Sequence, residues 1–235
     1  EDGPLKRFFS GEVVLTPCAP EEARRLFAAA EEASKKQIDT ILRHMQEDTD
    51  VIAELGAGYG GNLIRLAKAF QDKTGKSLTE CNIKLLMAEY TKTGRDLCLE
   101  TRKRKNAPDM ELQFIDHKAP DLSFLKQFKF PFILTIHSIE QVPEIPSDYF
   151  KILSEVAPNV RGLHMEPVGF QFEPDATKWA AHSAFMKRQN WNQNFADVIK
   201  QAEKDGYITI DSVDTSYAAG QPENPTTLVL WHSNS

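Results

Sequence analysis

The stretch Val51-Ile-Ala-Glu-Leu-Gly-Ala-Gly-Tyr-Gly-Gly61 combines an apolar run with a glycine-dense turn. The residues that follow it, 62–70, repeat apolar side chains at the three- and four-residue spacing of an amphipathic helix. A strand, a glycine loop and a helix in this order form a unit that holds nucleotide-like ligands, because glycine lets the backbone approach the ligand closely. We therefore predict a cofactor site in this stretch, in preference to a simple tight turn.

Two glycine patterns overlap in the loop. Gly56, Gly58 and Gly61 fit the G-x-G-x-x-G pattern of dinucleotide sites. Glu54 with Gly56, Gly58 and Gly60 fits the E-x-G-x-G-x-G pattern of methyltransferases. A carboxylate at this point would repel a pyrophosphate, whereas it suits the ammonium and sulfonium groups of S-adenosylmethionine. In this motif the sequence resembles the class I S-adenosylmethionine-dependent methyltransferases.

Composition indicates an ordinary globular protein with one large α/β domain and extensions, because the 235 residues are 41% hydrophobic and 26% charged. A net charge of -6 argues against binding to nucleic acid or to an acidic membrane, which both require a basic surface. The three cysteines lack C-x-x-C spacing and so indicate neither disulfides nor zinc. Without an apolar window of about 20 residues or a secretory leader, we expect a cytoplasmic protein with no membrane partner.

The order of the predicted elements indicates a doubly wound, seven-stranded, mostly parallel sheet. Strands are expected at 51–55, 83–88, 112–115, 130–136, 160–167, 207–213 and 226–231. Helices are expected at 21–45, 62–71, 91–105, 120–127, 149–156 and 191–204. The last two strands follow each other directly, which predicts the C-terminal antiparallel hairpin of a methyltransferase. We expect an N-terminal helical extension over 1–46 and the S-adenosylmethionine-binding domain over 47–235.

The resemblance implies roles for residues at the strand ends. The methionine part of the cofactor would lie near Glu54 and the first glycines. Glu89 ends the second strand, where one carboxylate can accept hydrogen bonds from both ribose hydroxyls. Tyr90 follows it and is also assigned to the cofactor site. After the third strand, Asp116 would contact the adenine amino group, with His117 beside it.

The fourth strand ends on His137-Ser-Ile-Glu140, where methyltransferases place residues that handle the substrate. The string resembles a region of some small-molecule and sugar O-methyltransferases. If the acceptor is a hydroxyl, a histidine with a pKa of about 6.5 can take its proton. We favour His137, which would also border the cofactor, over His164. Glu140 or Glu166 would orient an imidazole or anchor a cationic substrate. For each histidine a structural hydrogen bond or a contact with the substrate is the alternative.

His164 and Glu166 lie two residues apart on a predicted strand, so we expect both to line one wall of the cleft. A variant of this site joins them with Asp116 and His137 in a divalent-metal site for vicinal hydroxyls. Because no compact ligand motif is present, no metal is assigned.

Residues 167–190 are longer than a simple strand-to-helix connection and are rich in aromatic side chains. We predict a lid that shapes a substrate pocket and excludes water. The alternative is a satellite helix whose aromatic side chains pack against the domain.

These observations predict an S-adenosylmethionine-dependent methyltransferase that acts on a small-molecule hydroxyl or amine, with O-methylation slightly favoured. An NAD-dependent oxidoreductase and a non-catalytic S-adenosylmethionine-binding module are the alternatives. The oligomeric state and the identity of the acceptor stay open.

Overall fold

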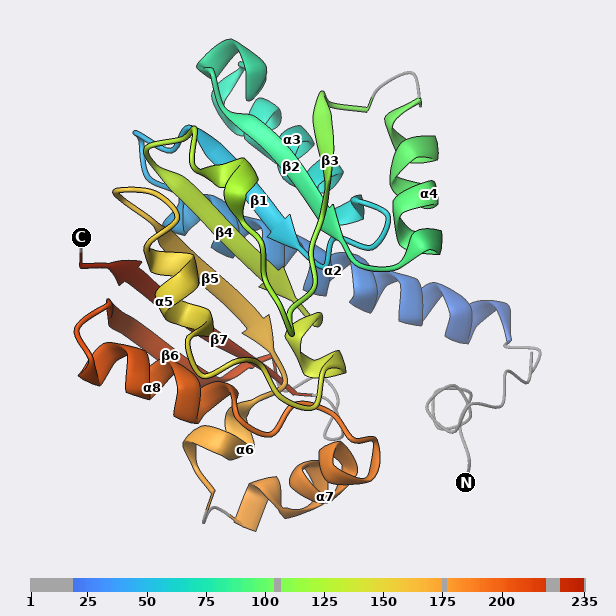
Figure 1. Ribbon diagram of the computed structural model, residues 1–235. Helices are drawn as coiled ribbons and strands as arrows, with labels where there is room; N and C mark the ends of the chain where they lie inside the picture. The colour runs from blue at the N-terminus through green and yellow to red at the C-terminus, as the bar shows by residue number, and fades with distance from the viewer. Residues whose placement is uncertain (1–18, 104–106, 175–176, 219–224, 235) are drawn as a thin grey trace. The chain divides into compact units, whose positions relative to one another are not determined.

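The computed structural model describes residues 19–103, 107–174, 177–218 and 225–234. The chain divides into two compact units, 1–39 and 40–235. Helix α2, Pro20–His44, begins in the first unit and ends in the second, which confirms the predicted helix (Figure 1). The boundary between the units falls inside this helix. The predicted domain division after residue 46 stays a prediction. Among the helices described, none combines the length and hydropathy of a bilayer crossing.

The second unit contains a seven-stranded sheet with the strand order β3-β2-β1-β4-β5-β7-β6, which confirms the predicted fold class. The strands are β1 Val51–Leu55, β2 Lys84–Glu89, β3 Met110–Phe114, β4 Pro131–Ile136, β5 Arg161–Glu166, β6 Ile208–Ala218 and β7 Thr226–Ser233. Strands β1 to β5 are parallel to their neighbours. Strand β7 is antiparallel to both β5 and β6, between which it lies.

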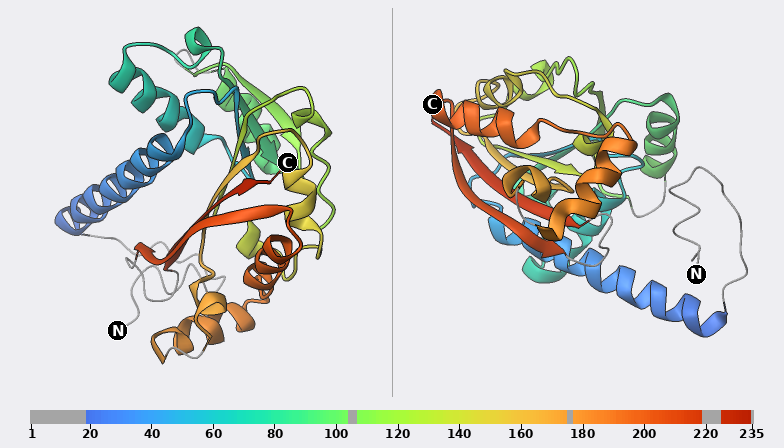
Figure 2. Two further views of the ribbon diagram at one scale, coloured as in Figure 1. Left: turned by 90° about the vertical axis from the view of Figure 1, so that its left-hand side faces the viewer. Right: turned by 90° about the horizontal axis from the view of Figure 1, so that it is seen from below.

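Helices cover both faces of the sheet, which is why the central strands are mostly apolar. The remaining α-helices are α3 Gly61–Thr74, α4 Lys92–Arg102, α5 Tyr149–Ser154, α6 Gly169–Phe172, α7 Ala180–Arg188 and α8 Phe195–Lys204. Helix α3 lies on one face, and α5 and α8 lie on the other (Figure 2). Every residue of β1 is therefore buried.

One predicted helix is wrong. Residues 120–127 form only a 3-10 turn, Ser123–Leu125. The carboxylate of Asp121 accepts a hydrogen bond from the backbone N–H of Ser123 at 2.9 Å. A local side-chain bond of this kind competes with the helical hydrogen bonds, so the segment turns instead of continuing as a helix.

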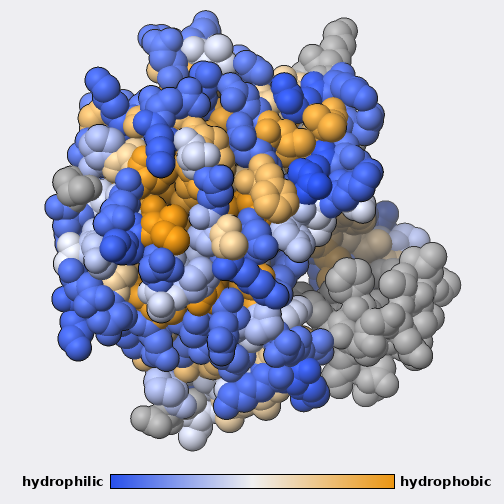
Figure 3. Space-filling view, in the orientation of Figure 1, coloured by the Kyte–Doolittle hydropathy of each residue, from blue (hydrophilic) through white to orange (hydrophobic). Residues whose placement is uncertain are grey.

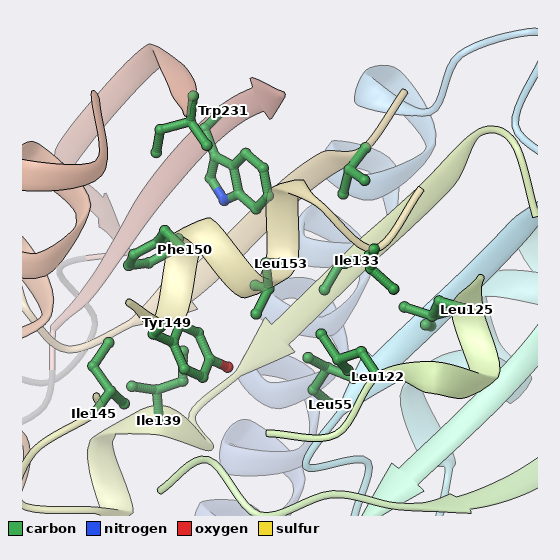
Figure 4. Packing of buried hydrophobic residues seen from close by; sticks show 14 of the residues in the cluster. Leu55, Leu122, Leu125, Ile133, Ile139, Ile145, Tyr149, Phe150, Leu153 and Trp231 are labelled. Carbon is green, nitrogen blue, oxygen red and sulfur yellow. The ribbon is translucent and has the colours of Figure 1, made fainter. Parts of the chain in front are cut away.

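The hydrophobic core joins helix α5 to strands that are far apart in the sequence (Figure 4). Phe150 of α5 has no exposed surface and packs edge-on against Phe195 and Trp231, with ring centroids 5.3 and 5.9 Å away. Burial of each such side chain contributes about 1.5–3 kcal/mol. This packing fixes α8 and β7 against the parallel strands.

The carboxyl ends of β1 to β5 meet at one edge of the sheet because these strands are parallel. After β3 the chain crosses to the far side of β1 and continues with β4, so the strand order reverses between β1 and β4. Doubly wound sheets bind their ligands at such a switch point. The glycine loop after β1 and the segment 137–141 after β4 lie at this position.

Candidate active site

The loop after β1 depends on glycine at positions with positive φ. Gly56, Gly58 and Gly60 have φ values of 82°, 56° and 79°. A Cβ atom at Gly56 would lie 2.3 Å from Cβ of Ser138, and one at Gly60 would lie 2.4 Å from Sδ of Met87. A Cβ atom at Gly58 would meet nothing within 4 Å. The outer glycines are therefore required by packing, whereas Gly58 borders open space where a ligand can approach.

Glu54 is a buried carboxylate directly before this loop, and its side chain is only 1% exposed. Asn62 of α3 donates a hydrogen bond to its Oε1 at 2.6 Å, while Oε2 has no partner among the described residues. Burial raises the pKa of Glu54 to about 7. A bound cation would restore the ionised form. The sequence interpretation missed Asn62, although its place in the first helical turn after the glycines was a usable signal.

Glu89 ties the glycine loop to the end of β2. Its Oε2 accepts a hydrogen bond from the backbone N–H of Gly58 at 3.0 Å. Its Oε1 accepts from both the N–H and the hydroxyl of Thr91, at 2.8 and 2.6 Å. Hydrogen bonds from the protein therefore occupy both lone pairs of Oε1, whereas Oε2 keeps one lone pair for a ligand. This differs from the expected arrangement in which the whole carboxylate faces two ribose hydroxyls.

Two aromatic rings lie exposed near Glu89, at the ends of β2 and β3. Tyr90 is 57% and Phe114 is 54% exposed, and their centroids are 5.9 Å apart. Arg95 lies 5.4 Å over the Phe114 ring. Figure 3 shows hydrophobic side chains gathered over α4 and the adjoining part of β3. The sequence treated Phe114 only as a strand residue, because alternation alone does not say which aromatic side chain lies at a ligand.

The two residues assigned after β3 differ in their surroundings. Asp116 is half-buried and accepts a hydrogen bond from the backbone N–H of Lys118 at 2.9 Å. His117 is buried, with Nδ1 lying 2.8 Å from the Tyr149 hydroxyl. Its Nε2 has no partner among the described residues and lies 3.6 Å from the position of a Cβ at Gly56. Burial lowers the pKa of His117 to about 4, so a neutral imidazole borders the loop.

His137 is held at both ring nitrogens. Its Nδ1 donates to Oε2 of Glu140 at 3.2 Å, and its Nε2 lies 2.8 Å from the hydroxyl of Thr226. Burial lowers the pKa of His137, but the hydrogen bond and charge of Glu140, with the charge of Glu166, outweigh it, and the pKa is raised. Its φ of 50° is unusual for a residue other than glycine. The structure therefore brings His137 and Glu140 together, in the geometry of an imidazole oriented by a carboxylate.

Glu166 is fully buried, and its carboxylate faces the backbone of the turn after β4, whereas Glu140 contacts the His137 side chain. Oε1 accepts hydrogen bonds from the N–H groups of Ser138 and Ile139, at 3.1 and 3.2 Å, and Oε2 accepts from that of Glu140 at 3.2 Å. Burial, followed by the charge of Glu140, raises the pKa of Glu166 to about 7. Glu166 thus holds the turn that carries His137, and its contacts are those of a positioning residue.

His164 lies in the core, where its side chain has no exposed surface. Trp231 donates an indole N–H to Nε2 at 2.7 Å, and Nδ1 lies 2.8 Å from the hydroxyl of Thr135. Burial lowers the pKa of His164 to about 3. With both nitrogens bonded inside the protein, the geometry favours the structural alternative over a catalytic base or a cleft wall.

The metal alternative gains no support from these positions. In the part of the chain that the structure describes, no group of three or more His, Cys, Asp or Glu side chains is placed to hold a metal ion. One of its proposed ligands, His164, already uses both ring nitrogens in the core.

Comparison with known proteins bears on the fold. No family model and no curated protein sequence matches the chain. A solved geranyl diphosphate methyltransferase in complex with S-adenosylmethionine does match, with a TM-score of 0.60, 12% identity and coverage of 94% of this chain and 93% of that one. The fold is that of the class I methyltransferases.

Two further methyltransferase structures show the same fold. The geranyl diphosphate C-methyltransferase from Streptomyces coelicolor A3(2) has a TM-score of 0.56 at 11% identity, over 94% of this chain and 86% of that one. The mitomycin 7-O-methyltransferase MmcR has a TM-score of 0.52 at 13% identity, over 91% of this chain and 58% of that one. At such low identity the shared feature is the methyltransferase fold.

Proposed function

We propose that this chain is an S-adenosylmethionine-dependent methyltransferase that acts on a small molecule. The observation that carries the proposal is the buried carboxylate of Glu54, with one unpartnered oxygen, directly before a loop of left-handed glycines at the switch point of the sheet. A buried anion of this kind suits a cationic ligand and disfavours a pyrophosphate. Solved methyltransferases of this fold hold S-adenosylmethionine or S-adenosylhomocysteine, which supports the same cofactor here.

The residues present fit this cofactor. Glu54 would face the ammonium and sulfonium groups of the cofactor, which would lie along the open side of Gly58. Glu89 would accept a hydrogen bond from a ribose hydroxyl. The exposed rings of Tyr90 and Phe114 would cover the flat adenine. When bound, the cofactor supplies a methyl group on a positively charged sulfur, and alignment of donor and acceptor provides much of the rate.

For the acceptor we propose a hydroxyl in preference to an amine. His137 would take the hydroxyl proton at Nε2, because Glu140 fixes the N–H of the imidazole at Nδ1 and Nε2 is then the nitrogen with a lone pair. The hydroxyl of Thr226, 2.8 Å from Nε2, would be displaced by the acceptor hydroxyl. The acidic net charge of -6 supports a small-molecule acceptor in preference to nucleic acid or an acidic membrane. A cytoplasmic location is part of the same proposal.

Titration calorimetry with S-adenosylhomocysteine and, separately, with NAD tests the cofactor. We expect heat of binding with the first ligand only; NAD binding alone would identify an oxidoreductase. Release of labelled methyl product from a pool of small metabolites then distinguishes an enzyme from a binding module.

Glu89→Ala should weaken binding of S-adenosylhomocysteine by about tenfold or more, because it removes a charge-assisted acceptor and the anchor of the Gly58 N–H. Glu111→Ala is the matched control, since Glu111 is an exposed carboxylate on β3 paired with Lys84. An unchanged dissociation constant for Glu89→Ala would remove Glu89 from the cofactor site.

A further inference from the structure

Buried polar side-chain atoms without a partner fall into two groups among the described residues. The first group, Glu54 Oε2 and His117 Nε2, borders the glycine loop. The second consists of both ring nitrogens of His182 in α7 and the hydroxyl of Thr227 in β7. The first group marks the proposed cofactor site, so the second calls for an explanation of its own.

His182 lies in α7 with only 1% of its surface exposed, among aromatic side chains. The Phe170 ring meets it edge-on at 5.3 Å, and the Trp179 ring lies 5.9 Å away at an angle of 51°. Phe170 has no hydrogen-bonding group, and the indole N–H of Trp179 is donated to Glu173 at 3.0 Å, so neither ring is a partner of the imidazole. Each unsatisfied buried polar group costs about 1–3 kcal/mol, which makes an imidazole with two such atoms an expensive core residue.

Thr227 of β7 lies beside the same aromatic side chains as His182. A Cβ atom at Gly169 would lie 2.9 Å from the Thr227 hydroxyl and 2.7 Å from Cζ2 of Trp179. The Trp179 ring therefore borders both Thr227 and His182. Thr227 also follows Thr226, whose hydroxyl contacts His137.

We infer that His182 and Thr227 bind a phenolic hydroxyl at the far end of a neutral, flat, largely apolar acceptor, separate from the hydroxyl that gives its proton to His137. This inference rests on the proposed function and specifies the substrate of the same site. An imidazole and a hydroxyl each offer a donor and an acceptor, which complements a hydroxyl group that has both. The flanking rings of Phe170 and Trp179 suit a flat apolar body.

The charges around the insertion favour a neutral acceptor. Burial lowers the pKa of His182 to about 4, so the imidazole is uncharged at neutral pH. Lys178, next to Trp179, is paired with Glu173 at 2.6 Å. Near His137 the buried groups are the carboxylates Glu140 and Glu166, which would repel an anionic substrate.

Thermal unfolding with simple probes tests this inference. Phenol should raise the melting temperature of the wild-type protein, whereas toluene, benzoate and benzylammonium at equal concentration should raise it less. His182→Phe keeps the ring and removes both unpaired nitrogens; it should leave the melting temperature of the free protein unchanged or higher and weaken phenol binding about tenfold or more. Thr227→Val should act in the same direction.

Matched variants distinguish an effect on phenol binding from an effect on the stability of the fold. His232→Phe changes a partly exposed histidine paired with Asp211 and should leave the phenol response unchanged. Thr135→Val removes a buried hydroxyl that has a partner and should lower the melting temperature. The imidazole ¹⁵N resonances of His182 should move on addition of phenol.

Two results would overturn the inference. The first is a lower melting temperature of His182→Phe with an unchanged phenol response, since the imidazole would then be bonded to water or to the chain. The second is an equal response of the wild type to toluene and phenol. Calorimetry with S-adenosylhomocysteine on the same proteins keeps the two proposals apart: failure of the wild type to bind it rejects the proposed function, and normal binding with no phenol response rejects only the acceptor class.

Discussion

Individual histidines show how the surroundings of a side chain decide its chemistry. His164 has no exposed surface and hydrogen bonds at both nitrogens, so it is fixed as a neutral core residue. His137 directly follows β4, with its N–H directed to Glu140 and its second nitrogen 2.8 Å from the Thr226 hydroxyl. The same residue type therefore stabilises the core at one position, and at the other it is the base that we propose.

Replacement of these two histidines should have opposite consequences. His137→Ala should lower turnover by about a hundredfold or more while changing cofactor affinity little, because a general base contributes to the chemical step alone. His164→Ala should lower the free energy of unfolding by about 2–5 kcal/mol, because it leaves a cavity and unpairs Trp231 and Thr135. Steady-state kinetics and urea unfolding measure the two effects. Equal losses of turnover and cofactor affinity in His137→Ala would argue against a base.

Glu54 should make cofactor binding depend on pH. Burial raises its pKa to about 7, above the unfolded value, so its contribution to stability is greatest below about pH 4.5 and is lost as the pH rises towards 7. A cationic ligand binds the ionised form, and the proton must leave. Affinity for S-adenosylmethionine should therefore rise between about pH 5.5 and 7, by at most about tenfold per pH unit.

Glu54→Gln should flatten this dependence, as measured by calorimetry across the same pH range. Glu111→Gln, at an exposed carboxylate on β3, serves as the control and should keep the wild-type slope. Identical slopes in the wild type and Glu54→Gln would show that another group takes up the proton.

At the scale of elements, different glycines of the loop after β1 serve packing and ligand access. Gly56 is enclosed by Ser138, whereas Gly58 has no protein atom where a side chain would begin. The loop stays in place because Gly58 donates its N–H to Glu89. A substitution at Gly58 therefore affects the space for a ligand more than the fold.

Gly58→Ala should cost only about 1–2 kcal/mol of stability, from its positive φ, but should weaken binding of S-adenosylhomocysteine strongly. Gly75→Ala is the matched control: this glycine also has positive φ, 74°, and also meets nothing within 4 Å, but it lies at the far end of α3. Urea unfolding and calorimetry on both variants make the comparison. Equal affinities of the two variants would mean that the ligand does not occupy the space beside Gly58.

At the scale of the whole molecule, β7 joins the sheet to the hydrophobic core. It lies between β5 and β6, antiparallel to both. Its Trp231 is 1% exposed and lies against Gly162, where a Cβ atom would be 2.1 Å from the indole nitrogen. Loss of this one side chain should weaken contacts on both sides of the strand.

Trp231→Ala should lower the free energy of unfolding by about 3–5 kcal/mol, and Trp231→Phe by less, because phenylalanine keeps part of the packing and loses only the bond to His164. Trp191→Ala, at a half-buried ring packed on Phe185, should cost less than Trp231→Ala. Urea unfolding measures all three. A cost of Trp231→Ala no larger than that of Trp191→Ala would contradict the central role of β7.

The sequence predicted the mostly parallel seven-stranded sheet and its C-terminal antiparallel hairpin, because local patterns encode the strands. The run before Gly56 and the acid at Glu89 are readable from a few neighbours. It could not decide the role of His164, since the partner Trp231 is 67 residues away and periodicity does not show which strand will lie beside β5. Likewise, the residues near Thr226 in the sequence do not indicate that its hydroxyl will contact His137, which is 89 residues away.

The chain of contacts that runs through His164 limits how this protein can evolve. Trp231, His164 and Thr135 are linked by hydrogen bonds, and Thr135 in turn bonds to Glu166. Replacing one member leaves polar atoms of the next without a partner, so we expect single replacements to lower stability more than compensated sets. In diverged homologues we therefore expect these positions to covary, most often by joint replacement with apolar residues at 135, 164 and 231.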